Sequence, residues 1–212
     1  MYRRNVNRFL AAAVVLALPI TVLAQSNVDT RDPAGLRRLQ DQTAGAVDVS
    51  IHKSTGAARF IRLKPGAVRG LGGGAAVSLA NKQQRSRTFF REYAALLGID
   101  DVAGMEFVGS RTDQIGETHL NWRQRYRSVP VYGTMIRTHF DREHQLKAVA
   151  GTAVPAIAVD PNPSIARARA ERAALDFESA DRAGAQLRIG SVTLYVYRQG
   201  LAQGVPGENL LA

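Results

Sequence analysis

Cysteine is absent from this 212-residue chain. Its absence excludes a disulfide framework, a thiolate metal site and a cysteine nucleophile. The histidines also lack the His-Glu-x-x-His spacing that places two zinc ligands and a base on one helix face; they are His52, His119, His139 and His144. No Gly-x-Ser-x-Gly elbow is present for a serine nucleophile. The sequence therefore predicts that this chain carries no catalytic residues, no cofactor site and no metal site.

Two further patterns suggest chemistry but have plainer explanations. The glycine run from Gly70 to Gly74 is not followed by Gly-Lys-Ser/Thr, so a flexible connection explains it better than a phosphate-binding loop. Glu117 and His119 share one face of a predicted strand and form a candidate acid/base pair, although packing on an exposed sheet face is the simpler interpretation.

Acidic residues are scarce in the first half of the chain. The whole sequence carries 28 Lys and Arg against 18 Asp and Glu, a net charge of +10. Residues 25–95 hold 12 basic and 5 acidic side chains, whereas residues 96–212 hold 13 of each. Arg85, Arg87 and Arg91 belong to this excess and form a candidate docking face for an acidic partner, with a solvated helix face as the alternative. Nucleic acid is not an expected partner, because no aromatic side chains are interleaved with the basic ones in a stacking pattern.

The N-terminus has the pattern of a secretory signal peptide over residues 1–24. Three arginines precede an apolar run, and small residues precede a cleavage site between Ala24 and Gln25. A membrane anchor is the alternative, but the apolar run is shorter than the ~18–20 residues that span a bilayer, and Pro19 interrupts it. We therefore expect a secreted or periplasmic protein without a stable membrane anchor.

The residues that follow predict an α+β fold. Residues 25–46 are polar and are expected to form a flexible segment. Ser78 is suited to cap a helix that ends at Gly98, with aromatic and leucine side chains at helical spacing. The later segments alternate as β-strands do. We expect an antiparallel meander sheet packed on the helix; the predicted strands are 47–51, 58–63, 105–111, 117–127, 131–140 and 145–150.

A second, incomplete α+β unit is predicted after a proline-bearing connector that begins at Val154. Ser164 is suited to cap a helix reaching about Ala180, with Ile165, Leu175 and Phe177 available for burial. Residues 191–198 have the alternation of a strand. One helix followed by one strand does not complete a layer, so the chain is expected to stop in the middle of this unit.

The meander carries a resemblance to a known family. The residues that match are Arg111, Asp113, Gly116, His119, Gln124, Tyr126, Pro130, Val131, Gly133, His139 and Gly151. Together they resemble the fungalysin/thermolysin propeptide (FTP) motif of secreted zinc metalloprotease precursors. Two positions depart from it: Ser128 and His144 stand where the family usually has glycine. Both positions are expected to need a left-handed backbone, so we predict slightly altered turns and an intact fold.

The resemblance implies a function. Residues 47–155 would form an FTP-like prodomain, and residues 156–212 a truncated PepSY-like unit. Such a prosegment acts as an intramolecular chaperone and inhibitor of a protease catalytic domain, in cis or in trans. The family's catalytic domain and its zinc would lie beyond residue 212, and no catalytic residue is carried over to this chain.

Two other functions stay open from the sequence. The chain is also consistent with a free-standing exported inhibitor or binding module that acts on a protease in trans. Its basic first half is consistent with an extracellular binder of polyanions. In each case we expect marginal stability for residues 164–212, because the second unit lacks strands to cover its helix.

Overall fold

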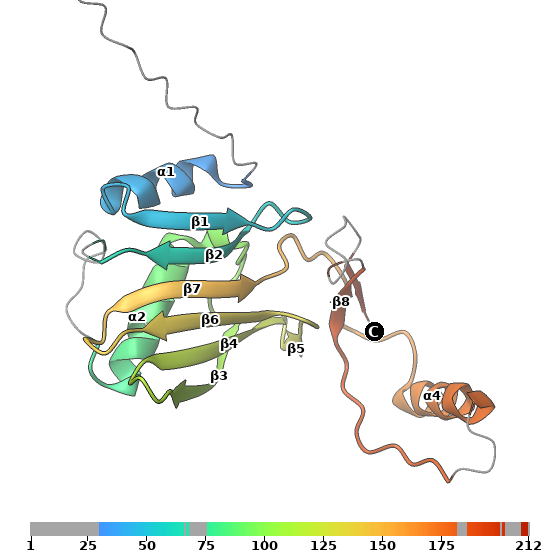
Figure 1. Cartoon of the computed structure of the whole chain (residues 1–212). Helices are drawn as coiled ribbons and strands as arrows, with labels where there is room; N and C mark the ends of the chain where they lie inside the picture. Colours follow the sequence, from blue (N-terminus) through green and yellow to red (C-terminus); the bar gives the residue numbers. More distant parts are fainter. Residues whose placement is uncertain are drawn as a thin grey trace, which may run out of the picture.

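The computed structural model describes residues 30–65, 67, 76–181, 186–199, 201 and 209–211. The predicted signal peptide with its Ala24–Gln25 junction, and the glycine run 70–74, lie outside the described residues. The described part has an α+β fold, as predicted, in which helices cover one face of an antiparallel sheet (Figure 1). The strands of this sheet are β1 (Val47–Ile51), β2 (Ala58–Leu63), β3 (Met105–Thr112), β4 (Thr118–Tyr126), β5 (Val129–Pro130), β6 (Met135–Phe140) and β7 (Leu146–Thr152).

The predicted meander is present but forms only part of the sheet. The strand order is β1-β2-β7-β6-β4-β3, with the short β5 paired to β4. The β1–β2 hairpin joins the meander through β7, where Ile61 is paired with Val149. The two early strands and the four later ones therefore share one core.

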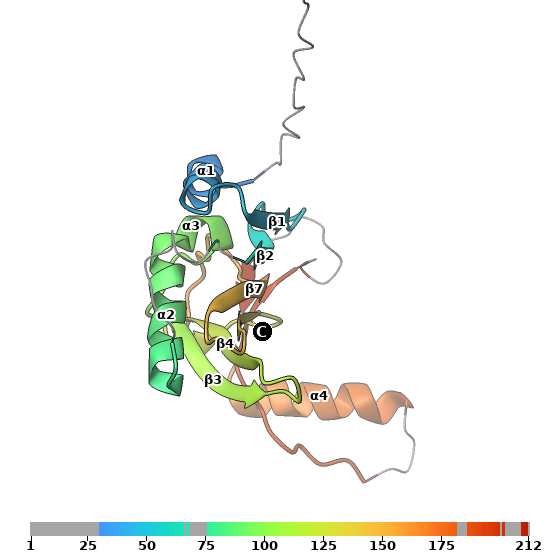
Figure 2. The same ribbon diagram turned by 60° about the vertical axis from the view of Figure 1, so that its left-hand side comes forward.

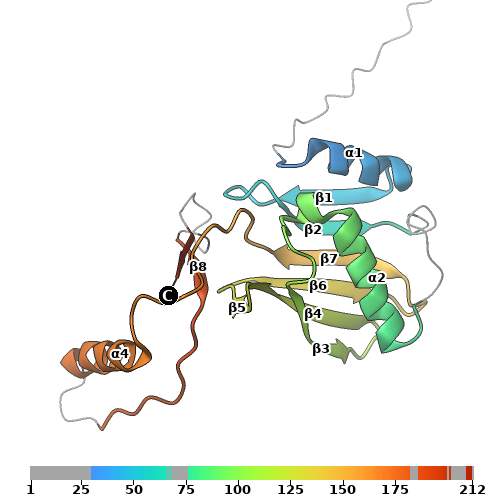
Figure 3. The same cartoon turned by 180° about the vertical axis from the view of Figure 1, so that it is seen from behind.

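Helix α2 (Leu79–Glu92) packs across this sheet (Figure 3). Ser78 caps it as predicted, since its hydroxyl oxygen accepts a hydrogen bond from the Asn81 amide at 3.1 Å. The predicted single helix is divided, because Tyr93 leaves helical geometry and a short helix α3 (Ala94–Leu97) follows. Gly98 then ends the helical segment with φ 72°, a conformation that glycine adopts without strain.

The core lies between α2, α3 and the sheet. Phe90 and Trp122 are fully buried, and their rings meet edge to face with centroids 5.3 Å apart. A small polar network is enclosed there: the hydroxyl groups of Ser86 and Thr138 are 2.8 Å apart, and the Trp122 indole N–H donates to Thr138 at 3.2 Å. These bonds satisfy buried polar groups that would otherwise destabilise the packing of α2 on the sheet.

The structure corrects the expectation of a flexible segment over residues 25–46 for its part from residue 33 to residue 42, whereas residues 25–29 lie outside the described residues. Residues 33–42 form helix α1 (Pro33–Gln42), whose N-terminus is capped by Asp32 through the Gly35 amide at 2.9 Å. Leu39 is fully buried against the core. The prediction missed this helix because half of its residues are polar and its only large apolar side chains are the buried Leu39 and the partly buried Leu36.

The second unit contains helix α4 (Arg167–Asp181), strand β8 (Val196–Arg198) and strand β9 (Asn209–Leu211), which pairs with β8. Helix α4 lies apart from the sheet, whereas strand β8 lies at the end of the sheet near β5 (Figures 1 and 3). The helix begins three residues after the expected Ser164 cap. The expected burial of Ile165 and Phe177 is wrong, because these side chains are 54% and 74% exposed. The expected strand over residues 191–198 is reduced to β8.

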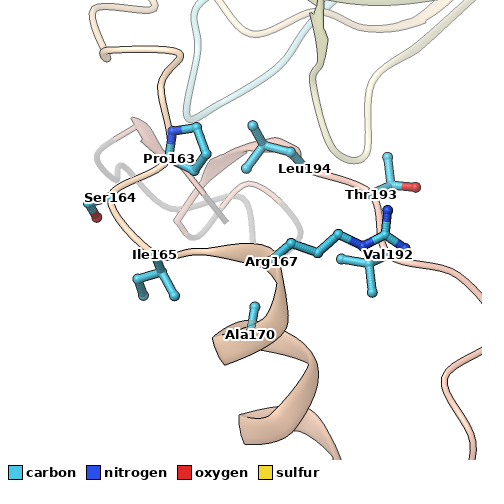
Figure 4. A pocket seen from close by; sticks show the side chains of 8 residues that line it. All are labelled: Pro163, Ser164, Ile165, Arg167, Ala170, Val192, Thr193 and Leu194. Carbon is cyan, nitrogen blue, oxygen red and sulfur yellow. The ribbon is translucent and has the colours of Figure 1, made fainter.

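A small cluster connects β8 to the sheet module. Val131, Val154 and Val196 bury one another in a second apolar cluster. The Tyr132 amide donates to the Val196 carbonyl oxygen at 2.8 Å. A cavity of about 350 Å³ lies between the start of α4 and the segment before β8 (Figure 4). It is lined by Pro163, Ser164, Ile165, Arg167, Ala170, Val192, Thr193 and Leu194.

Within the described part of the chain, no helix combines the length and apolar character that a membrane span requires.

Candidate functional site

The two faces of β4 divide the candidate residues into two groups. Leu120 and Trp122 are fully buried beneath α2, and Gln124 is 5% exposed on the same face. His119 lies on the opposite face, which none of the helices in the described part of the chain covers (Figure 2). The open face is the surface on which polar side chains of this segment are available for a function.

Several motif residues serve the fold. The Gln124 side chain forms two hydrogen bonds of 2.8 Å with the backbone of Val154, one to its N–H and one to its C=O. Val131 is buried, and its amide donates to the Gln124 carbonyl oxygen at 2.9 Å. Tyr126 packs against the cluster around Val131, and Val129 and Pro130 form β5 beside it.

The motif glycines are required by the backbone. At Gly151, φ is 128°, and a Cβ atom would lie 1.8 Å from the Met135 carbonyl oxygen. Gly116 and Gly133 have φ of 81° and 71°. Side chains at these positions would be strained, and at Gly151 they would also collide with β6.

The two departures from the family pattern confirm the predicted backbone. Ser128 has φ 70° and His144 has φ 60°, so both adopt the left-handed conformation that favours glycine. Arg127 joins Ser128 in the β4–β5 turn with φ 45°. The Arg125 guanidinium donates to the Ser128 carbonyl oxygen at 2.5 Å. The turn therefore persists without glycine, with backbone strain that glycine would relieve.

The outward group is a chain of three side chains, which we call the Asp-His-His chain. Asp113 Oδ2 lies 2.8 Å from Nε2 of His119, and Nδ1 of His119 lies 2.7 Å from Nδ1 of His139. The strand register places the two histidines directly opposite each other on β4 and β6. Asp113 belongs to the β3–β4 turn, where its other carboxylate oxygen accepts the amides of Ile115 and Glu117.

The environment of the Asp-His-His chain disfavours a proton on the His139 ring beyond its neutral form and on the Asp113 carboxylate. Burial lowers the pKa of His139 to about 4, and the positive charges of His119 and Arg137 act in the same direction. The hydrogen bond from His119 lowers the pKa of the Asp113 carboxyl, which stays ionised. Both shifts favour a neutral His139 beside an anionic Asp113 near neutral pH.

The candidate Glu117–His119 pair is not the pair that forms. Glu117 accepts a hydrogen bond from Lys147 of β7 at 2.5 Å, whereas His119 is engaged with Asp113 and His139. The sequence interpretation missed the His119–His139 pair because it depends on the register between β4 and β6. Aligning the two predicted strands across their turn would have brought these residues together.

The Asp-His-His chain has no room for a metal ion between its imidazoles. Two nitrogen ligands of a zinc ion stand about 3.3 Å apart when each lies ~2.0–2.1 Å from the metal in tetrahedral geometry, which exceeds the 2.7 Å found here. Among the described residues, no group of three or more His, Asp or Glu side chains is arranged to hold a metal ion.

The three arginines of the candidate docking face do not share one face. Arg87 and Arg91 are neighbours on α2, but Arg85 lies about 160° around the helix from Arg87. The Arg87 guanidinium stacks on the Trp122 ring, 5.0 Å from its centroid. Arg87 therefore packs on the core in addition to carrying a charge.

Residues 103–153 match the model of the Fungalysin/Thermolysin Propeptide Motif. This chain contains an FTP domain over those residues. Similar proteins include thermolysin of Alicyclobacillus acidocaldarius subsp. acidocaldarius and thermolysin of Bacillus caldolyticus. Each is 35% identical over 51 residues, which cover 24% of this chain and 9% of the relative.

A third relative is the thermostable neutral protease NprT of Geobacillus stearothermophilus. It is 32% identical over 65 residues, which cover 31% of this chain and 11% of the relative. The chain thus matches about a tenth of the length of these proteases. The matched segment contains the Asp-His-His chain, the Gln124 contacts and Gly151.

Proposed function

We propose that this chain is the prosegment of a secreted zinc metalloendopeptidase and acts as chaperone and inhibitor of a catalytic domain in cis. The observation that carries the proposal is the match of residues 103–153 to the propeptide motif. The residues of this motif form turns, core contacts and the Asp-His-His chain. A prosegment of this kind needs a stable recognition surface and no reaction chemistry of its own.

The energetic basis of such a role is linkage. A prosegment that binds only the native or near-native protease lowers the free energy of that state and shifts the folding equilibrium toward it. In this proposal residues 156–212 begin a PepSY-type unit, connected to the FTP domain through the Val131–Val196 contact. Zinc belongs to the catalytic domain, and this chain supplies no ligand to it.

The proposal also includes export of the chain and an electrostatic contribution to protease binding. The signal peptide over residues 1–24 would deliver the chain to the periplasm or the medium together with its protease. The basic excess of residues 25–95 would attract an acidic protease surface, with Arg85 and Arg91 contributing on different sides of α2. Charge reversal at Arg91, which is exposed, would then weaken binding most at low salt.

The test is a refolding assay with a denatured thermolysin-type catalytic domain. The full chain is added in trans, and the recovered peptidase activity is measured after the chain has been removed by dilution. Inhibition of the active enzyme is measured separately. We expect the chain to raise the recovered activity several-fold and to inhibit the folded enzyme.

The matched control is the Gly151→Val variant, which differs by one residue and cannot close the β6–β7 pair. It should give neither effect. Inhibition without assisted refolding would instead favour a module that acts on a protease in trans. Equal activity recovery with the wild-type chain and the control would contradict the proposal.

A further inference from the structure

We propose that Asp113, His119 and His139 form a proton-sensitive latch, which ties the β3–β4 turn to β6 and opens when the two histidines together take up two extra protons. This inference concerns the conformation of the chain itself. It goes beyond the proposed prosegment role and does not depend on it.

The hydrogen bonds determine how many protons the latch can hold. With both imidazoles neutral, Nε2–H of His119 donates to Asp113, and Nδ1–H of His139 donates to Nδ1 of His119. One extra proton is also accommodated, because His119 then donates from both nitrogens and His139 accepts at Nδ1. With a second extra proton, both Nδ1 atoms carry hydrogen. They cannot then remain 2.7 Å apart, and two positive charges are adjacent.

Because the latch is partly buried, a second positive charge in it is poorly screened by water. The His119 and Asp113 side chains are only 17% and 22% exposed, so water screens the pair incompletely. The charged neighbours are Arg111 on β3, Glu117 before β4, Arg137 on β6, Lys147 on β7 and, farther along the sheet, Arg62 on β2. Glu117 and Arg62 already have partners of opposite charge in Lys147 and Asp48. The remaining arginines add to the repulsion against a second imidazolium.

The latch connects three parts of the module. Asp113 holds the β3–β4 turn through the Ile115 and Glu117 amides, His119 lies on β4, and His139 lies on β6. The backbone ladder between β4 and β6 remains when the latch opens, so the expected change is a local loosening of the turn and the open face. Acid then destabilises this region before it unfolds the core.

The pH range follows from the direction of the shift. The folded chain binds the His139 proton only near pH 4, whereas an unfolded chain binds it near pH ~6.5. The unfolded state therefore holds more protons between these values, and stability falls as the pH drops from ~6.5 to about 4.

The first test is an NMR titration of the histidine ring nitrogens in the full wild-type chain, which needs no variant. At pH 7 we expect His119 to be protonated at Nε2 and His139 at Nδ1. On acidification the His139 ring should take up its proton near pH 4, and the signals of both rings should change as it does. Titration of His139 near pH ~6.5, or the opposite neutral tautomers, would overturn the latch.

The second test compares His139→Gln with His144→Asn, a control that removes an imidazole outside the latch and tolerates the left-handed backbone there. Thermal unfolding of the full chain is followed from pH 6.5 to pH 4. The wild-type chain and the control should lose about 5 °C more in melting temperature than His139→Gln over this range. Equal losses in all three proteins would contradict the latch.

Discussion

Helices α2 and α4 have nearly the same length, 14 and 15 residues, but very different surroundings. Helix α2 buries Phe89 and Phe90 against the sheet, whereas no side chain of α4 within residues 167–180 is buried. An isolated helix of this length is marginal in water. The comparison shows that the FTP-containing module supplies its own core, while the second unit has little apolar burial to hold its helix.

The largest expected effect tests this comparison with a matched pair of aromatic residues. Phe90→Ala removes a fully buried ring and should destabilise the chain by about 3–5 kcal/mol. Phe177→Ala removes a ring that is 74% exposed and should change the free energy of unfolding by less than about 0.5 kcal/mol. Urea unfolding followed by circular dichroism measures both. Similar losses of stability in the two variants would contradict the difference in packing between α2 and α4.

The next effect concerns the contact that joins the module to its connector. Gln124→Ala leaves the N–H and C=O of buried Val154 without their side-chain partner and should cost about 1–3 kcal/mol. Gln124→Glu keeps the acceptor for the Val154 N–H, but it places a buried carboxylate oxygen against the Val154 carbonyl oxygen. Chemical denaturation should show it to be the least stable of the three proteins. An Ala variant as stable as the wild type would show that this contact does not hold the connector.

The smallest effect is a stabilisation. Ser128→Gly should stabilise the chain by about 1 kcal/mol, because glycine adopts positive φ without strain. His144→Gly should gain less, because it also removes the ring whose Nδ1 lies 3.3 Å from Nζ of buried Lys82. Ser110→Gly, at an exposed position within β3, is the matched control and should destabilise. Differential scanning calorimetry resolves these shifts. A loss of stability in both turn variants would contradict the presence of backbone strain at these positions.

Much of the sheet module was predictable from the sequence, because alternation along 105–150 and helical spacing before Gly98 are strong local patterns. The positive φ at Ser128 and His144 followed from the family resemblance. Helix α1 was missed because few of its residues are large and apolar. The burial of Phe177 was wrongly predicted, because an apolar side chain does not always have a neighbour to pack against. The His119–His139 pair depends on strand register, which alternation within one strand does not specify and which only an alignment of the two strands across their turn would have given.

We propose that the FTP-containing module folds around its own core and binds a protease catalytic domain. Hydrogen exchange on the full chain, with and without an inactivated thermolysin-type catalytic domain, tests both parts of this proposal. We expect slow exchange in β4, β6 and β7 of the free chain, fast exchange in α4, and added protection when the catalytic domain is present. Equal protection of α4 and the sheet in the free chain, with no change on adding the catalytic domain, would contradict the proposal.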